Sequence, residues 1–230
     1  MIEDFAMQLK QGTKKSHTAA ENTKFVASFL RGVVNVDSYM KLIGNFYFVY
    51  RAMEEELEKY RDDDVVGPIL FKALYRTAAL EKDCEYFYGS GWRNMIAPTE
   101  ACQQYVNRIR EVSREGLIAH HYTRYIGDLS GGQILKGIAE KALDLTDGGL
   151  AFYEFPDIED KKMFKETYRA TLNLLPLDQS DVNNIITEAN YAFRLNMYMF
   201  DELQGNWFES VMAILCSMVT GKSRTNGMES

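Results

Sequence analysis

The stretch "AHHYTRYIGDLSGGQILKGIAEKAL", residues 119–143, decides the fold, because it reads as helix on both sides of a glycine-rich centre with no proline or polar cluster between them. Gly127, Gly131 and Gly132 are therefore predicted to lie within, or at a kink of, one long helix. Each glycine costs a helix about 1 kcal/mol relative to alanine. Bare backbone lets a flat ligand approach the helix axis, and Asp128 lies beside it, four residues before Gly132. The stretch predicts a surface for a planar ligand with a polar reacting centre.

The same glycines are compatible with two other kinds of structure. "LSGGQ", residues 129–133, also spells the phosphate-contacting signature of ABC-type ATPases, which needs a P-loop in the same domain. "GKS" occurs at residues 221–223, but Cys216 stands where the P-loop glycine belongs, and no strands are predicted. The ATPase reading is therefore set aside, whereas an ordinary turn between two helices stays open.

The remaining pattern predicts an all-α chain with a single helical domain. Only four prolines occur in 230 residues, and the apolar residues between them recur at helical spacing, as do Ile186, Ala189, Phe193, Phe200 and Leu203. No internal repeat or long linker interrupts the pattern. Helices are predicted at residues 5–22, 26–31, 45–60, 69–88, 99–113, 117–143, 161–174, 185–204 and 206–219.

Charge and composition restrict the classes of partner. The net charge of -7 argues against a broad nucleic-acid-binding surface. Three scattered cysteines fit a reducing, intracellular setting without disulfides. The chain is expected to begin directly in its fold, since its first residues lack the apolar region of a secretory signal. The apolar run at residues 211–219 is too short to span a bilayer, so no transmembrane anchor is predicted. It is expected to be a core or interface helix, and contact with a membrane surface stays open.

His17 is the second candidate for chemistry, because the chain has only three histidines. On a helix it follows Leu9 and Thr13 along one face, which predicts that it points inward. Glu21, one turn later, is placed to orient the imidazole. A purely structural histidine stays open. A ferritin-like di-iron site is excluded because no Glu precedes a His by three residues.

Four segments together resemble the haem oxygenases. Residues 119–143 resemble that family's signature, and "KKSHTAAEN" at residues 14–22 resembles its proximal-ligand helix. "FKETYR" at 164–169 and "YAFRLNM" at 191–197 follow in the expected order. The resemblance implies one all-α catalytic domain at residues 1–205, with haem b, which is also the substrate, between a proximal helix and a kinked distal helix. Residues 206–230 are expected to form a C-terminal helix and a short flexible tail.

The resemblance also implies residue roles. His17 would be the only protein ligand to iron, and Asp128 would deliver protons through water, with Arg124 and Tyr50 as further catalytic residues. The implied haem-binding set is Lys10, His17, Glu21, Tyr122, Gly127, Ser130, Gly131, Gly132, Lys165, Arg169, Phe193 and Asn196, in which Lys10, Lys165 and Arg169 would anchor the propionates. Without the resemblance, the three cations would read as solvated surface charges and the aromatic residues as core.

The implied reaction uses O2 and reductant to convert haem to biliverdin, with α cleavage expected, carbon monoxide and ferrous iron. Ferredoxin would be the electron donor, docking on Lys10, Lys14 and Lys15, and a bilin reductase is a candidate downstream partner. The expected compartment is the cytoplasm, or the plastid stroma if a transit peptide has been removed. A haem carrier or sensor with this fold, and more distantly a thiaminase-like hydrolase with a cysteine nucleophile, are the alternatives.

Overall fold

The computed structural model describes residues 4–219 and the side chains of residues 4–203, and within that range it contains helices and no strand. The all-α prediction is confirmed. The α-helices are α1 (Phe5–Glu21), α2 (Lys24–Leu30), α3 (Val36–Glu58), α4 (Thr77–Tyr88), α5 (Glu100–Glu111), α6 (Arg114–His121), α7 (Gly127–Ala142), α8 (Lys161–Asn173) and α9 (Gln179–Val219).

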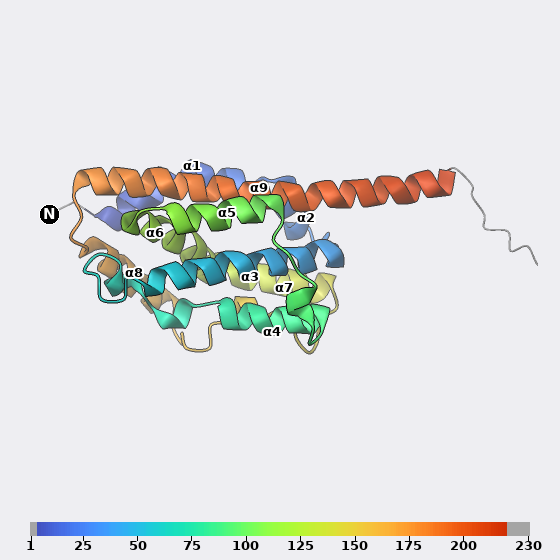
Figure 1. Ribbon diagram of the computed structural model, residues 1–230, viewed down its shortest axis with the longest axis horizontal. Helices are drawn as coiled ribbons and strands as arrows, with labels where there is room; N and C mark the ends of the chain where they lie inside the picture. Colours follow the sequence, from blue (N-terminus) through green and yellow to red (C-terminus); the bar gives the residue numbers. More distant parts are fainter. Residues whose placement is uncertain (1–3, 220–230) are drawn as a thin grey trace, which may run out of the picture.

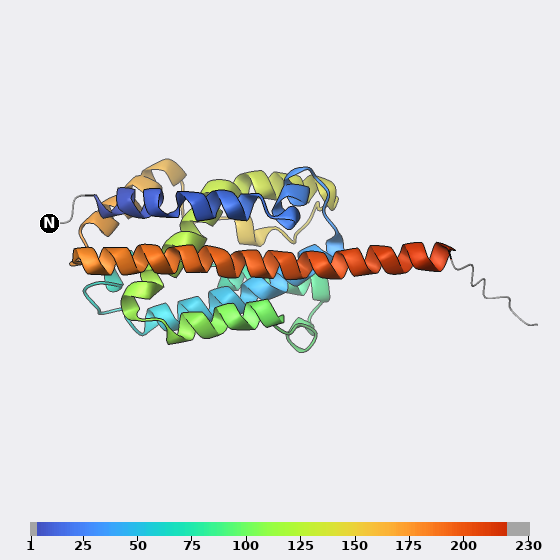
Figure 2. The same ribbon diagram turned by 90° about the horizontal axis from the view of Figure 1, so that it is seen from above.

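The long helix α9 organises the fold. It packs against α1, α5 and α6, with α1, α2 and α7 on one side of it and α3 and α5 on the other (Figures 1 and 2). Its close contact with α1 depends on Gly12, because a Cβ there would lie 2.5 Å from Cγ2 of Ile186. The contact is fixed further by Ser16, which donates a hydrogen bond to the amide oxygen of Asn190. The proximal helix of the sequence prediction is thus held along one face by α9.

The apolar face predicted for α9 is partly correct. Ala189 and Leu203 are buried as expected, but Ile186, Phe193 and Phe200 are only half-buried. These three lie at the edge of the buried face and contact α1 and α2, where the Phe200 ring stacks 5.6 Å from that of Phe25. The helix also continues past residue 205 without a break, so residues 206–219 extend α9 and do not form a separate helix. The division of the chain into 1–205 and 206–230 stays a prediction, and the tail beyond residue 219 lies outside the described residues.

The helix predicted at residues 69–88 begins only at Thr77. The preceding residues form two single 3-10 turns, η1 (Gly67–Ile69) and η2 (Lys72–Leu74). The interruption is fixed by Glu54 on α3, whose carboxylate accepts hydrogen bonds from the backbone N–H groups of Arg76 and Thr77, at 2.6 and 3.2 Å. The sequence pattern missed the interruption because short turns bury their apolar residues at spacings close to those of a helix.

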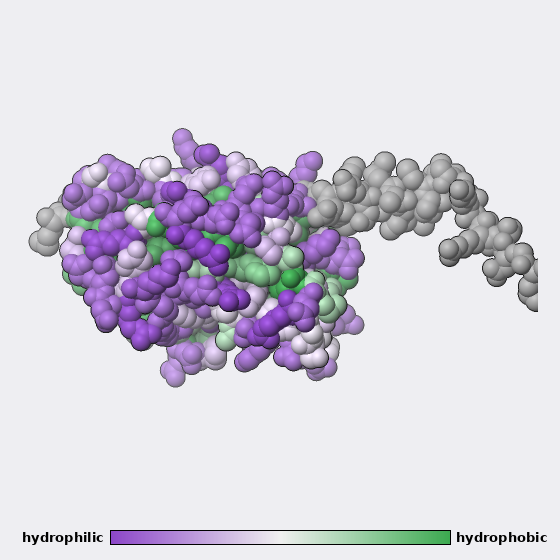
Figure 3. All heavy atoms as spheres, viewed as in Figure 1, coloured by the Kyte–Doolittle hydropathy of each residue, from purple (hydrophilic) through white to green (hydrophobic). Residues whose placement is uncertain are grey.

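Charged and polar side chains cover most of the face seen in Figure 3, with small apolar patches between them. Across the part of the chain that the structure describes, no helix is both long and apolar enough to cross a membrane. Inside, Glu188 of α9 accepts a bidentate hydrogen bond from Arg108 of α5 and a third bond from Nε2 of His120 on α6, at 3.0 Å. These bonds hold the pKa of Glu188 at about 2, despite its burial.

Candidate functional site

The glycine-rich stretch follows a π-helical segment, η4 (Tyr122–Ile126), which joins α6 directly to α7. The chain changes direction here (Figures 1 and 2), which agrees with the predicted kink in one long helical stretch. A π segment makes the helix one residue wider per turn and is found mostly at functional sites. In this protein Arg124 within the segment and Asp128 just after it both contact Tyr50 of α3.

The three glycines of α7 lie in different surroundings. A Cβ added to Gly127 or Gly131 would have no heavy atom of another element within 4 Å, so the backbone faces open space at both positions. At Gly132, a Cβ would lie 3.4 Å from the ring of Tyr153, so this glycine packs against protein. The predicted strip of bare backbone is present at Gly127 and Gly131, and Asp128 and the exposed Ser130 lie on the same two turns.

Asp128 belongs to a hydrogen-bond network with α3, η4 and α9. Tyr50 donates its hydroxyl hydrogen to Oδ2 of Asp128. Nε of Arg124 donates to the Tyr50 hydroxyl at 2.9 Å, and Nη2 of Arg124 lies 3.7 Å from Oδ1 of Asp128. Nη1 of Arg124 donates to the side-chain oxygen of Asn196, which extends the network to α9. The structure therefore brings together all three predicted catalytic residues and one predicted ligand contact.

The electrostatics of this network follow from burial. Desolvation raises the pKa of Asp128, although Arg124 and the hydroxyl of Tyr50 both oppose the rise. Burial also raises the pKa of Tyr50 well above its ordinary value, so the phenol keeps its proton and is the donor to Asp128. Arg124 keeps its charge because Tyr50 and Asp128 outweigh its own desolvation and raise its pKa. Asp128 is a carboxyl group that can take up and release a proton in a largely water-excluded place.

Three residues of this network were not predicted as site residues. Phe46 lies one turn before Tyr50 on α3, and its ring centroid is 4.4 Å from the Arg124 guanidinium carbon. The Tyr105 hydroxyl accepts a hydrogen bond from Nδ2 of Asn196 at 3.5 Å. The Phe152 ring packs 5.5 Å from that of Tyr50. Of the three, only Phe46 could have been found from the sequence, by its i, i+4 spacing from Tyr50. Tyr105 and Phe152 contact the network from segments distant in the chain.

The prediction that His17 points inward is wrong. Leu9 and Thr13 are buried on α1, but the His17 side chain is 55% exposed. The physical reason is that α9 covers the adjacent face of α1, along Gly12 and Ser16, which leaves His17 at the edge with the Phe193 ring 5.8 Å away. Nδ1 of His17 lies 3.6 Å from Oε1 of Glu21, too far for a hydrogen bond.

The α1 helix comes close to η4, the segment that leads into the glycine stretch, at Tyr122. Tyr122, the first residue of η4, is half-buried, and burial raises its pKa while Thr13 of α1 and Arg169 of α8 lie close enough to oppose the rise. Away from this point α1 makes its main contacts with α9 and α8, and α7 makes its own with α2, η4 and the 3-10 turn η5 (Ala151–Tyr153). On α1, His17 lies one turn after Thr13, and on the other chain segment Gly127 lies five residues after Tyr122.

The predicted propionate anchors lie on α1 and α8, which pack against each other. Lys10 and Arg169 are exposed and Lys165 is half-buried. In the region with placed side chains, none of the three makes an ion pair with a carboxylate. They are cations available to an anionic ligand near the point where α1, η4 and α8 come close to one another.

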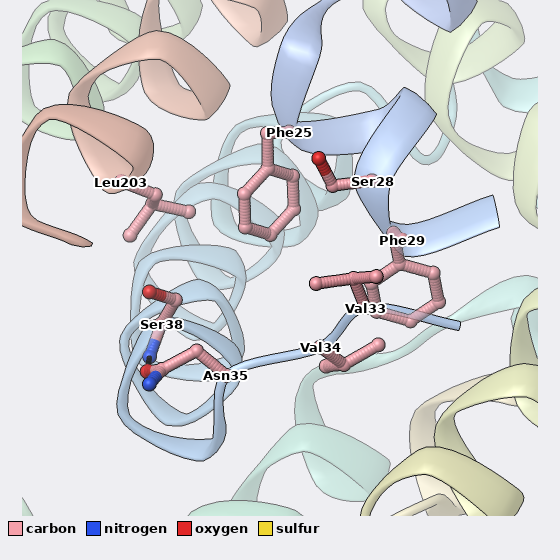
Figure 4. Close-up of a pocket in the computed structure, with 8 residues that line it drawn as sticks. All are labelled: Phe25, Ser28, Phe29, Val33, Val34, Asn35, Ser38 and Leu203. Atoms are coloured by element: carbon pink, nitrogen blue, oxygen red, sulfur yellow. Dashed lines mark hydrogen bonds between the residues drawn. The ribbon is translucent and has the colours of Figure 1, made fainter. Parts of the chain in front are cut away.

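A separate small hollow lies between α2, the start of α3 and α9 (Figure 4). Its lining is mainly apolar and includes Phe25, Phe29 and Leu203, while the backbone N–H of Ser38 donates a hydrogen bond to the side-chain oxygen of Asn35, another lining residue. None of the predicted site residues lines it. The predicted site residues lie instead on α1, α3, η4, α7, α8 and α9.

Comparison with known proteins agrees with the arrangement. The sequence profile of the family described as "Heme oxygenase" matches residues 3–202. "Heme oxygenase 1" of Synechocystis is 51% identical over 99% of this chain and 95% of its own length, and "Heme oxygenase 1" of Gallus gallus is 46% identical over 89% and 71%. The crystal structure of the Synechocystis protein in complex with heme superposes with a TM-score of 0.89, covering 94% of this chain and all of that one. The chain therefore belongs to the haem oxygenase family.

Proposed function

We propose that the chain binds haem between α1 and α7 and converts it, with O2 and electrons, to α-biliverdin, carbon monoxide and ferrous iron. Family membership supports the reaction, and the Synechocystis relative was solved in complex with heme. The observation that carries the proposal is the pairing of an exposed imidazole on α1 with bare backbone on α7, on two chain segments that come close at Tyr122. A flat macrocycle with a metal at its centre needs a ligand on one face and close approach on the other.

The donor set fits haem. His17 offers a neutral imidazole, the proximal ligand used by many haem proteins, and Phe193 beside it offers an apolar contact for the ring. Gly127 and Gly131 leave the opposite side free of side chains. Haem itself supplies both the metal that activates O2 and the ring that is cut. Glu21 would restrict rotation of the His17 imidazole through charge, and Ser130 and Gly132 would complete the wall of α7.

Asp128 would deliver protons through water to the reacting oxygen. A carboxyl group next to a water is an efficient proton donor when its pKa is raised toward the working pH, as burial does here. Tyr50 and Arg124 would hold the carboxylate in one orientation, and Asn196 would hold Arg124. A haem carrier or sensor, the alternative with the same fold, would have no use for such a buried proton donor.

Lys10, Lys165 and Arg169 would bind the two propionates. Their positions on neighbouring helices and their freedom from other ion pairs support this role. We further propose that a ferredoxin supplies the electrons, docking on Lys10, Lys14 and Lys15, all of which are exposed, and that a bilin reductase receives the product. The cyanobacterial and algal relatives support a cytoplasmic or plastid location.

The test of the proposed function is direct. Purified protein is mixed with haem, then with air and either ascorbate or reduced ferredoxin, and the absorption spectrum is followed. The haem bands should give way to the broad red absorption of a bilin, and chromatography should identify the α isomer. Stable haem bands under both reductants would leave the carrier or sensor as the better reading.

The bare backbone of Gly131 should be required for haem binding. Gly131→Leu is expected to weaken binding at least tenfold, because the new side chain occupies the space of the ring. Gly137→Leu is the matched control, since a Cβ at Gly137 also has no neighbour within 4 Å and the residue lies on the same helix. Haem titration of both variants measures the effect. Equal affinity of the two would remove Gly131 from the site.

Lys165 and Arg169 should set the orientation of haem more than its affinity. Apolar burial of the macrocycle dominates binding, whereas exposed ion pairs contribute about 1 kcal/mol or less each. Lys165→Gln combined with Arg169→Gln is expected to leave the dissociation constant within about tenfold and to yield a mixture of biliverdin isomers. Lys161→Gln with Lys162→Gln, on the same helix, removes equal charge and should keep one isomer. A pure α product from the first pair, at unchanged affinity, would contradict the assignment.

A further inference from the structure

The wall behind the Asp128 network is η5, a single 3-10 turn. Its Phe152 ring packs 5.2 Å from Phe46 and 5.5 Å from Tyr50, the two aromatic residues in contact with the Arg124 guanidinium. Its Tyr153 supplies the ring that faces Gly132. The turn therefore supports both the donor to Asp128 and the glycine stretch of α7.

Two buried side chains of opposite charge hold this turn by its backbone. Asp83 of α4, 1% exposed, accepts hydrogen bonds from the N–H of Ala151 and the N–H of Phe152, both at 2.8 Å. Arg76, 4% exposed, donates from Nη1 to the carbonyl oxygens of Phe152, at 3.4 Å, and Glu154. Asp83 thus binds N–H groups of the turn, and Arg76 binds carbonyl groups in and just after it.

Burying two charged side chains costs folding free energy, which argues that the position of η5 is important for the protein. Burial raises the pKa of Asp83 to about 6, although both N–H bonds oppose the rise. Among the residues with placed side chains, neither Asp83 nor Arg76 has an ion-pair partner. Asp83 is balanced by the two N–H groups, whereas the Arg76 guanidinium also lies 3.9 Å from the centroid of the Phe155 ring and is favoured by the charges of Asp128 and Glu54. A three-residue turn has too few internal hydrogen bonds to hold itself, since 3-10 turns of this length satisfy only one or two of their own peptide groups.

We propose that Asp83 and Arg76 are positioning residues for Asp128: by fixing η5 they set the place of Tyr50 and of the glycine stretch of α7. The inference rests on the proposed function. The connection to α7 is direct, because Nε2 of Gln133 donates to the carbonyl oxygen of Tyr153 at 2.8 Å. The connection to α3 is made by the packing of Phe152 on Tyr50.

The hydrogen bonds between Asp83 and η5 should depend on pH, because Asp83 is titratable. Burial raises the pKa of Asp83 above that of a solvated carboxyl, so ionisation costs more in the held turn than in an opened one, and the contribution of Asp83 to holding η5 is complete below the ordinary carboxyl pKa and falls as the pH rises through about 6. The N–H groups of Ala151 and Phe152 therefore face a neutral carboxyl group below about pH 6 and a carboxylate above it. A polar hollow beside Asp83 lies between α4, α7 and the loop at residues 145–151. The titratable groups that face Asp83 or line this hollow are Lys82, Cys84 and Tyr86 on its own helix, Tyr39 on α3, Lys136 and Glu140 on α7, Asp147 in the following loop, and Tyr153 and Glu154 at η5.

Asp83→Asn is the decisive variant, because an amide keeps the size of the carboxylate but can accept from only one of the two N–H groups. In the haem-free wild type, the NMR shifts of the Ala151 and Phe152 amides should titrate with a midpoint near pH 6. In the variant they should not titrate, and exchange of one of these amides should become about tenfold faster. Glu140→Gln, an exposed acid of the same hollow, is the control and should match the wild type.

The effect on function is measured as the rate of single-turnover biliverdin formation at matched haem occupancy. Asp83→Asn should slow this step about tenfold with little change in haem affinity, since no group in contact with the ligand is altered. Gln133→Ala, at an exposed position outside the core, should act in the same direction, because it removes the hydrogen bond to the carbonyl oxygen of Tyr153. Amides that do not titrate in the wild type, or wild-type turnover in both variants, would overturn the inference. Absence of bilin from the wild type would instead remove the proposed function and this inference with it.

Discussion

His17→Ala is expected to keep haem bound and to lose biliverdin formation by at least about 100-fold. Removing residues that merely orient a metal ligand already costs 10- to 100-fold, so removal of the ligand itself should cost at least as much. Binding should persist because burial of the macrocycle and the propionate contacts do not depend on the imidazole. The absorption spectrum of the complex should change from that of a histidine-ligated haem, and free imidazole should partly restore both the spectrum and turnover.

The other two histidines provide matched controls. His120 bonds Glu188 and His121 bonds the Tyr168 hydroxyl at 2.8 Å, and both side chains are fully buried in the core. His120→Gln and His121→Asn keep a polar atom near the bonded ring nitrogen, so these variants should fold, bind haem and turn over. Loss of the histidine spectrum in either variant, with a normal spectrum in His17→Ala, would show that the ligand had been misassigned.

Asp128→Ala is expected to bind haem normally and to form biliverdin on the order of 100-fold more slowly, the usual contribution of a positioned acid or base. The loss arises because no other described carboxylate belongs to the network of Tyr50 and Arg124. With added peroxide the variant should oxidise phenols as a peroxidase does, since uncontrolled proton delivery diverts oxygen from the ring. Single-turnover bilin yield and phenol oxidation are measured together.

Two milder variants separate the carboxylate from its support. Asp128→Asn retains a polar group that can order water, and Tyr50→Phe retains the carboxylate but removes its hydrogen-bond donor. Both should give bilin yields between those of the wild type and Asp128→Ala. A normal yield from Asp128→Ala at full haem occupancy would end the proton-delivery proposal.

The sequence by itself determined the helical class, most helix positions, and the candidate site residues on two helices. Each amphipathic segment keeps its helical periodicity, so α1, α5 and α8 lie close to their predicted places, whereas α3 begins at Val36, nine residues before its predicted start. The glycines at 127 and 131 could be interpreted because a helix interior gives glycine a cost that calls for a local reason. Asp128 followed from them by its spacing along the same helix.

Only the tertiary structure decided what these residues meet. The network of Asp128, Tyr50, Arg124 and Asn196 joins three separate segments of the chain, and no local pattern encodes which hydroxyl will reach which carboxylate. Helical spacing placed His17 on the same face of α1 as Leu9 and Thr13, but it does not show how much of that face another helix covers. In the structure α9 covers only the adjacent part of α1, so the His17 side chain is exposed. The η5 turn had no sequence signal either, because its place is fixed by buried side chains distant in the chain.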